Sequence, residues 1–324
     1  MNSLKNILKK ITFLIIIGIH VFTYADEVVK IKFPNAEILN QFTTRIPIKL
    51  IDHLIVIEAE IENRTGNFII DTGSESLILN KVHFPEKYNI NKKEYNTSGI
   101  LNYIDNPIEK RLKQFNIKNF NLKNKISDVI NLSHIEESKK IEVLGIIGFS
   151  ILKDYEIFVD LYLNQITLTK TDKKGNKLYD KVYAEKIADS INFNLKNHMI
   201  VLQGQVMDEN VSLGFDTAAE INLINKNAKR KVLKHFQPSE RLNLRGASGK
   251  TIEIMAGNLY RVKLSETVYV GPMKTMLTNL NKMNTAFGTR LDGIIGYEFL
   301  KYKRTIINYK KEKLYFINYP KFKL

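Results

Sequence analysis

The sequence contains no cysteine among its 324 residues. This absence excludes a disulfide framework, a cysteine nucleophile and zinc–thiolate sites. It also excludes a lipid anchor of the bacterial type, which needs a cysteine at the cleavage site. The protein must therefore be held together by its hydrophobic cores, for which a hydrophobic content of 44% is ordinary.

The sequence also lacks the signatures of several large enzyme classes. It has no Walker loop, no dinucleotide-binding fingerprint, no Gly-x-Ser-x-Gly elbow and no metal-ligand spacing. We therefore expect no cofactor and no metal ion. The net charge of +15 comes from scattered lysines, and no basic run is interleaved with aromatic residues. The sequence therefore does not favour nucleic-acid binding.

Long apolar runs are absent except at the N-terminus. A basic start precedes an apolar run from residue 11 to residue 22, and Thr23-Tyr24-Ala25 forms a small-x-small cleavage site. This pattern predicts a secretory signal peptide at residues 1–25 and export to the periplasm or the medium. The alternative is an uncleaved N-terminal anchor, for which the run is short.

What the sequence does contain is a repeated unit built around two aspartates. Asp71 lies in Ile70-Asp71-Thr72-Gly73-Ser74, and Asp216 lies 145 residues later in Phe215-Asp216-Thr217-Ala218-Ala219. An Ile-Ile-Gly segment follows each aspartate, at residues 146–148 and 294–296. Self-similarity at a nearly fixed offset indicates an internal repeat. We therefore predict two similar lobes, at residues 26–185 and 186–324.

Most of the repeat consists of short β-branched runs typical of strands, and each aspartate ends a strand that closes a hairpin. The pattern predicts one longer helix, from Asn225 to Phe236, and short helices at Phe149–Tyr155 and Tyr297–Lys303. Val28–Phe33 alternates like a strand, and the polar segment Thr169–Lys186 resembles a linker between the lobes.

A carboxylate at the end of a strand, followed by a tight loop, is suited to activating water. Backbone N–H groups of the loop can bind the carboxylate, Gly73 permits a close approach, and Thr72 and Thr217 can each bond to the facing loop. Two adjacent carboxylates cannot both ionise, so one keeps a proton. Because Ser74 can donate a hydrogen bond to Asp71, we predict that Asp71 is the ionised partner and Asp216 holds the proton.

These motifs resemble those of the pepsin-like and retropepsin-like aspartic peptidases, over roughly residues 45–320. The resemblance implies an all-β fold of two homologous closed-barrel lobes with a cleft between them. It also implies that Gly246-Ala247-Ser248-Gly249 belongs to a substrate-covering flap. The first-lobe counterpart, from Thr97 to Asn106 and including Tyr103, matches the family loosely.

The function that this resemblance implies is that of an aspartic endopeptidase, with Asp71 and Asp216 as the catalytic pair. Both aspartates are on one chain, so we expect a monomer acting on a peptide or protein substrate. The second loop reads Asp-Thr-Ala rather than Asp-Thr-Gly, and a positive φ at Ala218 would be strained. The rival interpretation is therefore an inactive peptide- or protein-binding module on the same fold. An exported structural protein is a third alternative.

Two histidines, His53 and His198, occupy the same position in the repeat, 18 residues before each aspartate. We interpret them as structural rather than as metal ligands. Glu75 and Glu220 are interpreted as solvated or turn-stabilising residues. Asp160 becomes Asn308 in the second copy, so a shared catalytic role is not expected for it.

Overall fold

The computed structural model describes residues 31–85, 97–98, 103–104, 108–245 and 251–319 of the chain. The predicted signal peptide at residues 1–25 lies outside these ranges. Within them, no helix is both long enough and apolar enough to cross a membrane. Strands make up most of the described chain, so the predicted all-β fold is confirmed.

The first lobe is a sheet that closes on itself. Its strands are β3 (Lys49–Ile51), β4 (Leu54–Ile61), β5 (Arg64–Ile70), β6 (Leu77–Asn80), β9 (Ile108–Ile117), β10 (Phe120–Ile130) and β11 (Gly145–Ile147). They lie in the order β3-β4-β5-β11-β6-β10-β9. Strand β4 also pairs with β9, through Glu60–Asn116 and Ile61–Phe115. This pairing closes the six strands from β4 to β9 into a barrel.

The second lobe repeats this arrangement. Its strands are β15 (Asn194–Lys196), β16 (Met199–Val206), β17 (Glu209–Phe215), β18 (Asn222–Asn225), β19 (Phe236–Arg245), β20 (Thr251–Leu259), β21 (Val262–Lys263), β22 (Tyr269–Val270), β23 (Met273–Thr278) and β24 (Gly293–Ile295). Their order is β19-β20-β23-β18-β24-β17-β16-β21-β22, and β15 pairs with β16. Strand β21 follows β20 directly in the chain and pairs with Gln205 and Val206 of β16. The chain connection from β20 to β21 therefore brings the two sides of this sheet together and closes the ring.

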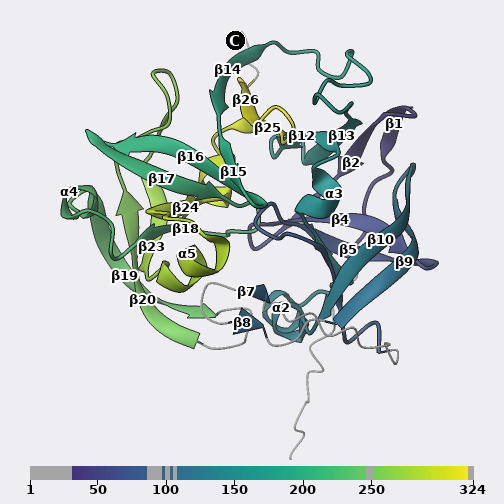
Figure 1. The fold of residues 1–324 in the computed structure, drawn as a ribbon, viewed down its shortest axis with the longest axis horizontal. Coiled ribbons are helices and arrows are strands. Elements are labelled where there is room, and N and C mark those ends of the chain that lie inside the picture. Colours follow the sequence, from purple (N-terminus) through teal and green to yellow (C-terminus); the bar gives the residue numbers. More distant parts are fainter. Residues whose placement is uncertain (1–30, 86–96, 99–102, 105–107, 246–250, 320–324) are drawn as a thin grey trace, which may run out of the picture.

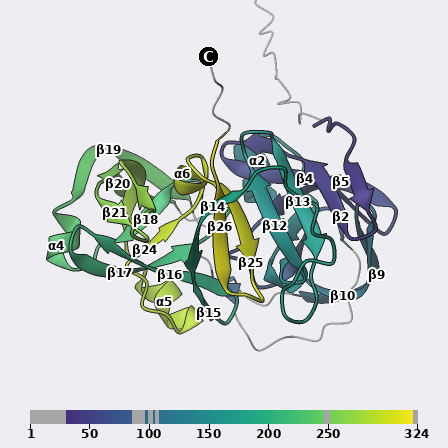
Figure 2. The same cartoon turned by 90° about the horizontal axis from the view of Figure 1, so that it is seen from above.

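A third sheet joins the two lobes. It consists of β1 (Glu37–Asn40), β2 (Thr43–Pro47), β12 (Tyr155–Asp160), β13 (Gln165–Lys170), β14 (Ile187–Asn192), β25 (Arg304–Asn308) and β26 (Lys313–Ile317). The order is β1-β2-β13-β12-β25-β26-β14, so first-half and second-half strands meet where β12 pairs with β25. Figures 1 and 2 show this sheet between the lobes.

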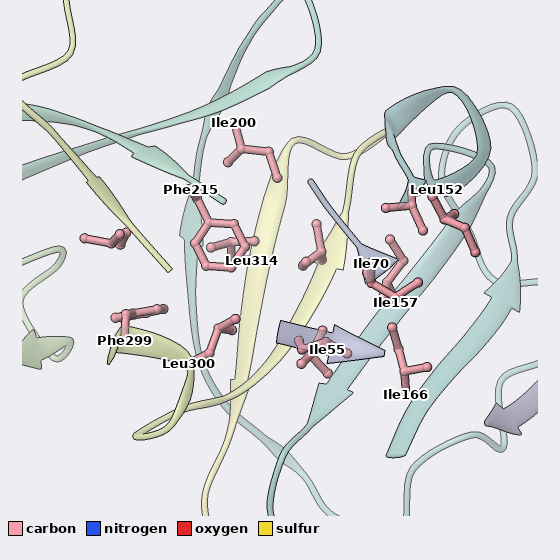
Figure 3. Close-up of a cluster of buried hydrophobic side chains, with 14 of the residues drawn as sticks. Ile55, Ile70, Leu152, Ile157, Ile166, Ile200, Phe215, Phe299, Leu300 and Leu314 are labelled. Carbon is pink, nitrogen blue, oxygen red and sulfur yellow. The ribbon is translucent and has the colours of Figure 1, made fainter. Parts of the chain in front are cut away.

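The main hydrophobic core runs from one half of the chain to the other. First-half residues such as Ile55, Ile70 and Ile157 share one buried cluster with second-half residues such as Phe215 and Leu314. Figure 3 shows these side chains side by side, around the ends of the strands that carry the aspartates. The aspartate loops therefore stand on a core to which both lobes contribute.

The helices are short: α2 (Ser133–Lys139), α3 (Phe149–Leu152), α4 (Arg230–Leu233), α5 (Asn281–Phe287) and α6 (Tyr297–Leu300). Helices α3 and α6 confirm the two short helices predicted after the Ile-Ile-Gly segments, although both end earlier than expected. The predicted helix over Asn225–Phe236 is wrong beyond α4. Asn225 belongs to β18, which pairs with both β23 and β24, and Phe236 begins β19.

The strand predicted at Val28–Phe33 is also wrong in its described part. Residues 31–36 are not a strand, and the first strand is β1, which starts at Glu37. Ile31 and Phe33 instead pack against a buried cluster of the first lobe. Their alternating pattern therefore reflects contact with the core rather than pairing in a sheet.

Candidate active site

Asp71 and Asp216 meet where the two lobes join. Asp71 follows β5 and Asp216 follows β17, and their carboxyl groups are hydrogen-bonded to each other. Each backbone is held by the neighbouring parallel strand. The N–H of Asp71 donates to the carbonyl of Ile147 (3.1 Å), and the N–H of Asp216 donates to the carbonyl of Ile295 (3.0 Å).

The loop after each aspartate folds back onto its carboxylate. In the first lobe, Oδ1 of Asp71 accepts hydrogen bonds from the N–H groups of Gly73 (2.7 Å) and Ser74 (2.9 Å). In the second lobe, Oδ1 of Asp216 accepts one from the N–H of Ala218 (2.8 Å). These bonds fix the orientation of both carboxyl groups toward the junction.

Two threonines join the loops to each other. The N–H of Thr72 donates to Oγ1 of Thr217, and the N–H of Thr217 donates to Oγ1 of Thr72, both at 3.0 Å. Each hydroxyl also donates to a carbonyl of the opposite strand, Thr217 to Ile70 (2.8 Å) and Thr72 to Phe215 (3.3 Å). Both threonines are fully buried. This arrangement holds the two aspartates at a fixed separation.

Gly73 and Ala218 differ in their surroundings. A methyl group at Gly73 would lie 2.6 Å from Oδ2 of Asp216, so only glycine fits there. Neither Gly73 nor Ala218 has a positive φ. Ala218 packs against a cluster of buried first-lobe residues that includes Leu132 and Ile146. The alanine in the second loop therefore carries none of the backbone strain that a positive φ would impose.

The two Ile-Ile-Gly segments support the aspartate loops from beneath. Phe149, directly after Gly148, donates its N–H to the carbonyl of Ser74 (2.8 Å). In the second lobe Tyr297, directly after Gly296, donates to the carbonyl of Ala219 (2.9 Å). A methyl group on either glycine would lie 2.6 Å or less from a carbonyl oxygen of the loop. Each Ile-Ile-Gly segment therefore packs directly against the aspartate loop of its own lobe.

Burial raises the pKa of both aspartates. The pKa of Asp71 is raised well above its ordinary value by burial and then by the charge of Asp216. The pKa of Asp216 is also raised by burial, but N–H groups of Ala218, Gly73 and Ala219 and the bond from Asp71 oppose the rise. The buried site therefore favours the neutral form of each carboxyl group more than water does.

The side-chain contact from which Asp71 was predicted to be the ionised partner differs in the structure. That prediction assumed that the Ser74 hydroxyl donates to Asp71. In the structure Oγ of Ser74 donates to the carbonyl of Ser76 (3.2 Å) instead, and only the N–H of Ser74 reaches the carboxylate. The side-chain difference between Ser74 and Ala219 therefore does not decide which aspartate is ionised.

The predicted flap residues Gly246, Ala247, Ser248 and Gly249 lie outside the described residues. The long hairpin that leads to them, β19–β20, is described. In the first lobe β7 (Thr97–Ser98) and β8 (Tyr103–Ile104) form a small antiparallel hairpin. In the view of Figure 1 both hairpins lie toward the edge of the molecule opposite the shared sheet.

The two histidines of the repeat make contacts across the junction. The ring of His53 stacks on Tyr297 of the second lobe, with centroids 4.0 Å apart and planes 7° apart. His198 lies 3.1 Å, through Nε2, from the carbonyl oxygen of Gly73 in the first lobe. No cluster of metal-binding side chains occurs among the described residues. Glu220, interpreted as solvated, forms an ion pair across the junction with Lys139 (2.7 Å).

Sequence reasoning missed three residues that surround the pair. Tyr309 is buried, and both aspartates contribute to raising the pKa of its hydroxyl. Asn222 and Ser150 bond to backbone N–H groups beneath the loops. None of these three had a sequence signal. His198 did have one, its shared repeat position with His53, but that signal did not indicate the contact with Gly73.

The family comparison agrees with this geometry. Residues 55–159 match the family model described as retroviral aspartyl protease. The match includes the Asp71 loop and the first Ile-Ile-Gly segment, whereas Asp216 lies beyond it. A comparison with curated proteins finds no match. The chain is therefore similar to the retroviral aspartyl protease family over residues 55–159.

Proposed function

We propose that this protein is an aspartic endopeptidase in which Asp71 and Asp216 act together on one water molecule. The observation that carries the proposal is the pair of hydrogen-bonded carboxyl groups, held by two loops that bond reciprocally through Thr72 and Thr217. Two close carboxylates with one shared proton are the arrangement that this chemistry needs.

The raised pKa of each aspartate supports a pair in which one carboxyl group is ionised and the other is protonated. The ionised aspartate takes a proton from water as that water attacks the peptide carbonyl carbon. The protonated aspartate donates a hydrogen bond to the carbonyl oxygen as that oxygen gains negative charge. The leaving nitrogen then receives a proton from the pair. No covalent enzyme intermediate and no cofactor enters this scheme.

The expected substrate is an extended peptide lying in the junction between the lobes, beneath the β19–β20 and β7–β8 hairpins. Both aspartates come from one chain, which supports a monomeric enzyme. The signal-peptide pattern at residues 1–25 supports an enzyme exported from the cytoplasm. We also propose that the boundary between the two lobes lies at residues 185–186.

Cleavage of a randomised peptide pool by residues 26–324, between about pH 3 and pH 8, tests the proposal. Asp71→Asn and Asp216→Asn are the informative variants, because asparagine keeps the shape of the side chain but cannot share the proton. We expect wild-type cleavage and at least about a 1,000-fold loss in each variant. Asp292→Asn is a matched control, since Asp292 accepts the N–H of Ser212 (2.9 Å) away from the pair.

Cleavage that survives in either variant would remove that aspartate from the mechanism. Folded wild-type protein without activity at any pH, which nevertheless binds peptides from the pool, would favour a non-catalytic binding module. The Asp-Thr-Ala loop alone does not favour that alternative, because Ala218 fits without a positive φ.

A further inference from the structure

His198 connects the second lobe to the loop that follows Asp71. It occupies the turn between β15 and β16, and its Nε2 lies 3.1 Å from the carbonyl oxygen of Gly73. A carbonyl oxygen only accepts hydrogen bonds, so Nε2 carries the proton and donates it. The side chain is buried, and Nδ1 has no hydrogen-bond partner among the described residues. Burial also holds the pKa of His198 below its ordinary value, against the nearby Glu75 and Asp216.

The backbone of Gly73, which His198 contacts, lies against the carboxyl groups of both Asp71 and Asp216. The N–H of Gly73 donates to Oδ1 of Asp71 at 2.7 Å. On the other side, Gly73 is so close to Asp216 that an added methyl group would lie 2.6 Å from its Oδ2. A small displacement of Gly73 would therefore weaken a bond to Asp71 and change the space around Asp216.

We propose that His198 is a positioning residue for the aspartate pair, which it serves by anchoring the Gly73 peptide from the opposite lobe. This inference rests on the proposed peptidase function. His198 acts through Gly73 and does not touch the reacting atoms itself. His53 at the equivalent repeat position stacks on Tyr297, so the two histidines have different tasks. The anchoring is therefore a property of one side of the junction.

Two substitutions separate anchoring from packing, because they remove different parts of the side chain. His198→Phe keeps an aromatic ring beside Phe287, which the His198 ring meets edge-on at 5.0 Å, but has no N–H to donate. His198→Gln loses the ring but keeps an amide N–H near the position of Nε2. Anchoring predicts that Gln is the better replacement, whereas packing predicts that Phe is.

We expect kcat to fall about tenfold in His198→Phe, because the loss of one net hydrogen bond corresponds to about that factor. In His198→Gln, which keeps an N–H donor, we expect kcat to fall about threefold or less. KM should stay within about twofold in both variants, because neither change touches the substrate. His53→Phe, which preserves the stack on Tyr297, is the matched control and should keep kcat within about twofold. A kcat for His198→Phe equal to or above that of His198→Gln would overturn the proposal. So would an equal loss in His53→Phe.

A second measurement decides the inference even if the proposed function fails. The titration of the two aspartate carboxyl carbons, followed by NMR in labelled protein, reports on the pair without any substrate. Loss of the anchor weakens N–H bonds to the charged form, so the lower apparent pKa of the pair should rise in His198→Phe and not in His198→Gln. Inactive wild-type protein, together with this shift in His198→Phe, would refute the peptidase and retain the anchor. Identical titrations in all three proteins would refute the anchor.

Discussion

At the scale of single residues, the two aspartate loops are not equivalent. Gly73 is confined by the carboxyl group of Asp216, whereas Ala218 has room for its methyl group beside the first-lobe core. The third loop position therefore needs glycine in the first lobe only. This difference explains how an Asp-Thr-Ala loop can coexist with an intact pair of carboxyl groups.

Substituting the third loop position in each lobe tests this asymmetry. In Gly73→Ala the new methyl group would push the carboxyl group of Asp216 aside, so we expect at least about a 100-fold loss of kcat from misplacement. The fold should survive, since the displaced atoms are the end of one side chain. Ala218→Gly should keep most of its activity and lose about 0.5–1 kcal/mol of stability. Peptide cleavage and thermal unfolding measure the two effects, and equal activity losses would contradict the argument.

The raised pKa of Asp71 also predicts how stability depends on pH. Folding raises this pKa above its ordinary value of 3.8, so the folded state binds the proton more tightly than the unfolded state does. Stability from this group is therefore fully present below pH 3.8 and is lost as pH rises through the raised pKa. Asp71→Asn removes the unfavourable free energy of burying a carboxylate at this position.

We accordingly expect Asp71→Asn to unfold at a higher temperature than wild type at neutral pH, with the difference disappearing in acid. Asp216→Asn should change stability in the same direction, because burial also raises the pKa of Asp216. Thermal unfolding between about pH 3 and pH 8 measures both. A destabilised Asp71→Asn protein at neutral pH would show that the charge is compensated better than the pKa implies.

At the scale of the elements, the junction depends on two loops that satisfy each other's backbone. Thr72→Val leaves the buried N–H of Thr217 without its acceptor, and Thr217→Val does the same to Thr72. Each substitution should cost about 1–3 kcal/mol of unfolding free energy and also reduce kcat, because the aspartates lose their fixed separation. The double variant should cost less than the two single losses together. Strictly additive losses in denaturant unfolding would mean that the two threonines act independently.

The first residues of helices were predicted well where the repeat fixed them and poorly elsewhere. Helices α3 and α6 follow directly from the two Ile-Ile-Gly segments. The helix predicted from Asn225 to Phe236 failed because pairing of β18 and β19 with distant strands outweighs the local helical pattern. Local helix propensity predicts structure poorly when both ends of a segment belong to strands that pair with distant parts of the chain.

At the scale of the whole molecule, a buried ion pair links the two halves of the shared sheet. Arg304 of β25 bonds to Asp160 of β12 through two nitrogens, at 2.6 Å and 3.1 Å, and neither side chain is more than 1% exposed. Arg304→Met leaves Asp160 buried without its partner, so we expect a loss of about 3–5 kcal/mol. Adding Asp160→Asn should restore part of the loss. Urea unfolding of wild type, Arg304→Met and the double variant measures both effects. An Arg304→Met protein as stable as wild type would contradict the expectation.

The shared sheet and core also predict that the two lobes unfold together. Strand β12 pairs with β25, and one buried cluster contains residues of both lobes. Exposing one lobe alone would leave apolar surface of the other in water. We expect a single unfolding transition for residues 26–324, and no stable fold for residues 26–185 alone. Two separate transitions in calorimetry would show that the lobes are independent.

The sequence by itself determined the all-β class, both aspartate loops and the two Ile-Ile-Gly segments. Local patterns that repeat at a nearly fixed offset can be recognised without a structure. The sequence also indicated the threonine contacts, since their chemistry follows from the Asp-Thr motif. Only the tertiary structure decided what the Ser74 hydroxyl contacts, why Ala218 is tolerated and what His198 contacts. Those answers depend on how closely the two lobes approach each other, because a contact such as that of His198 with Gly73 joins residues far apart in the sequence.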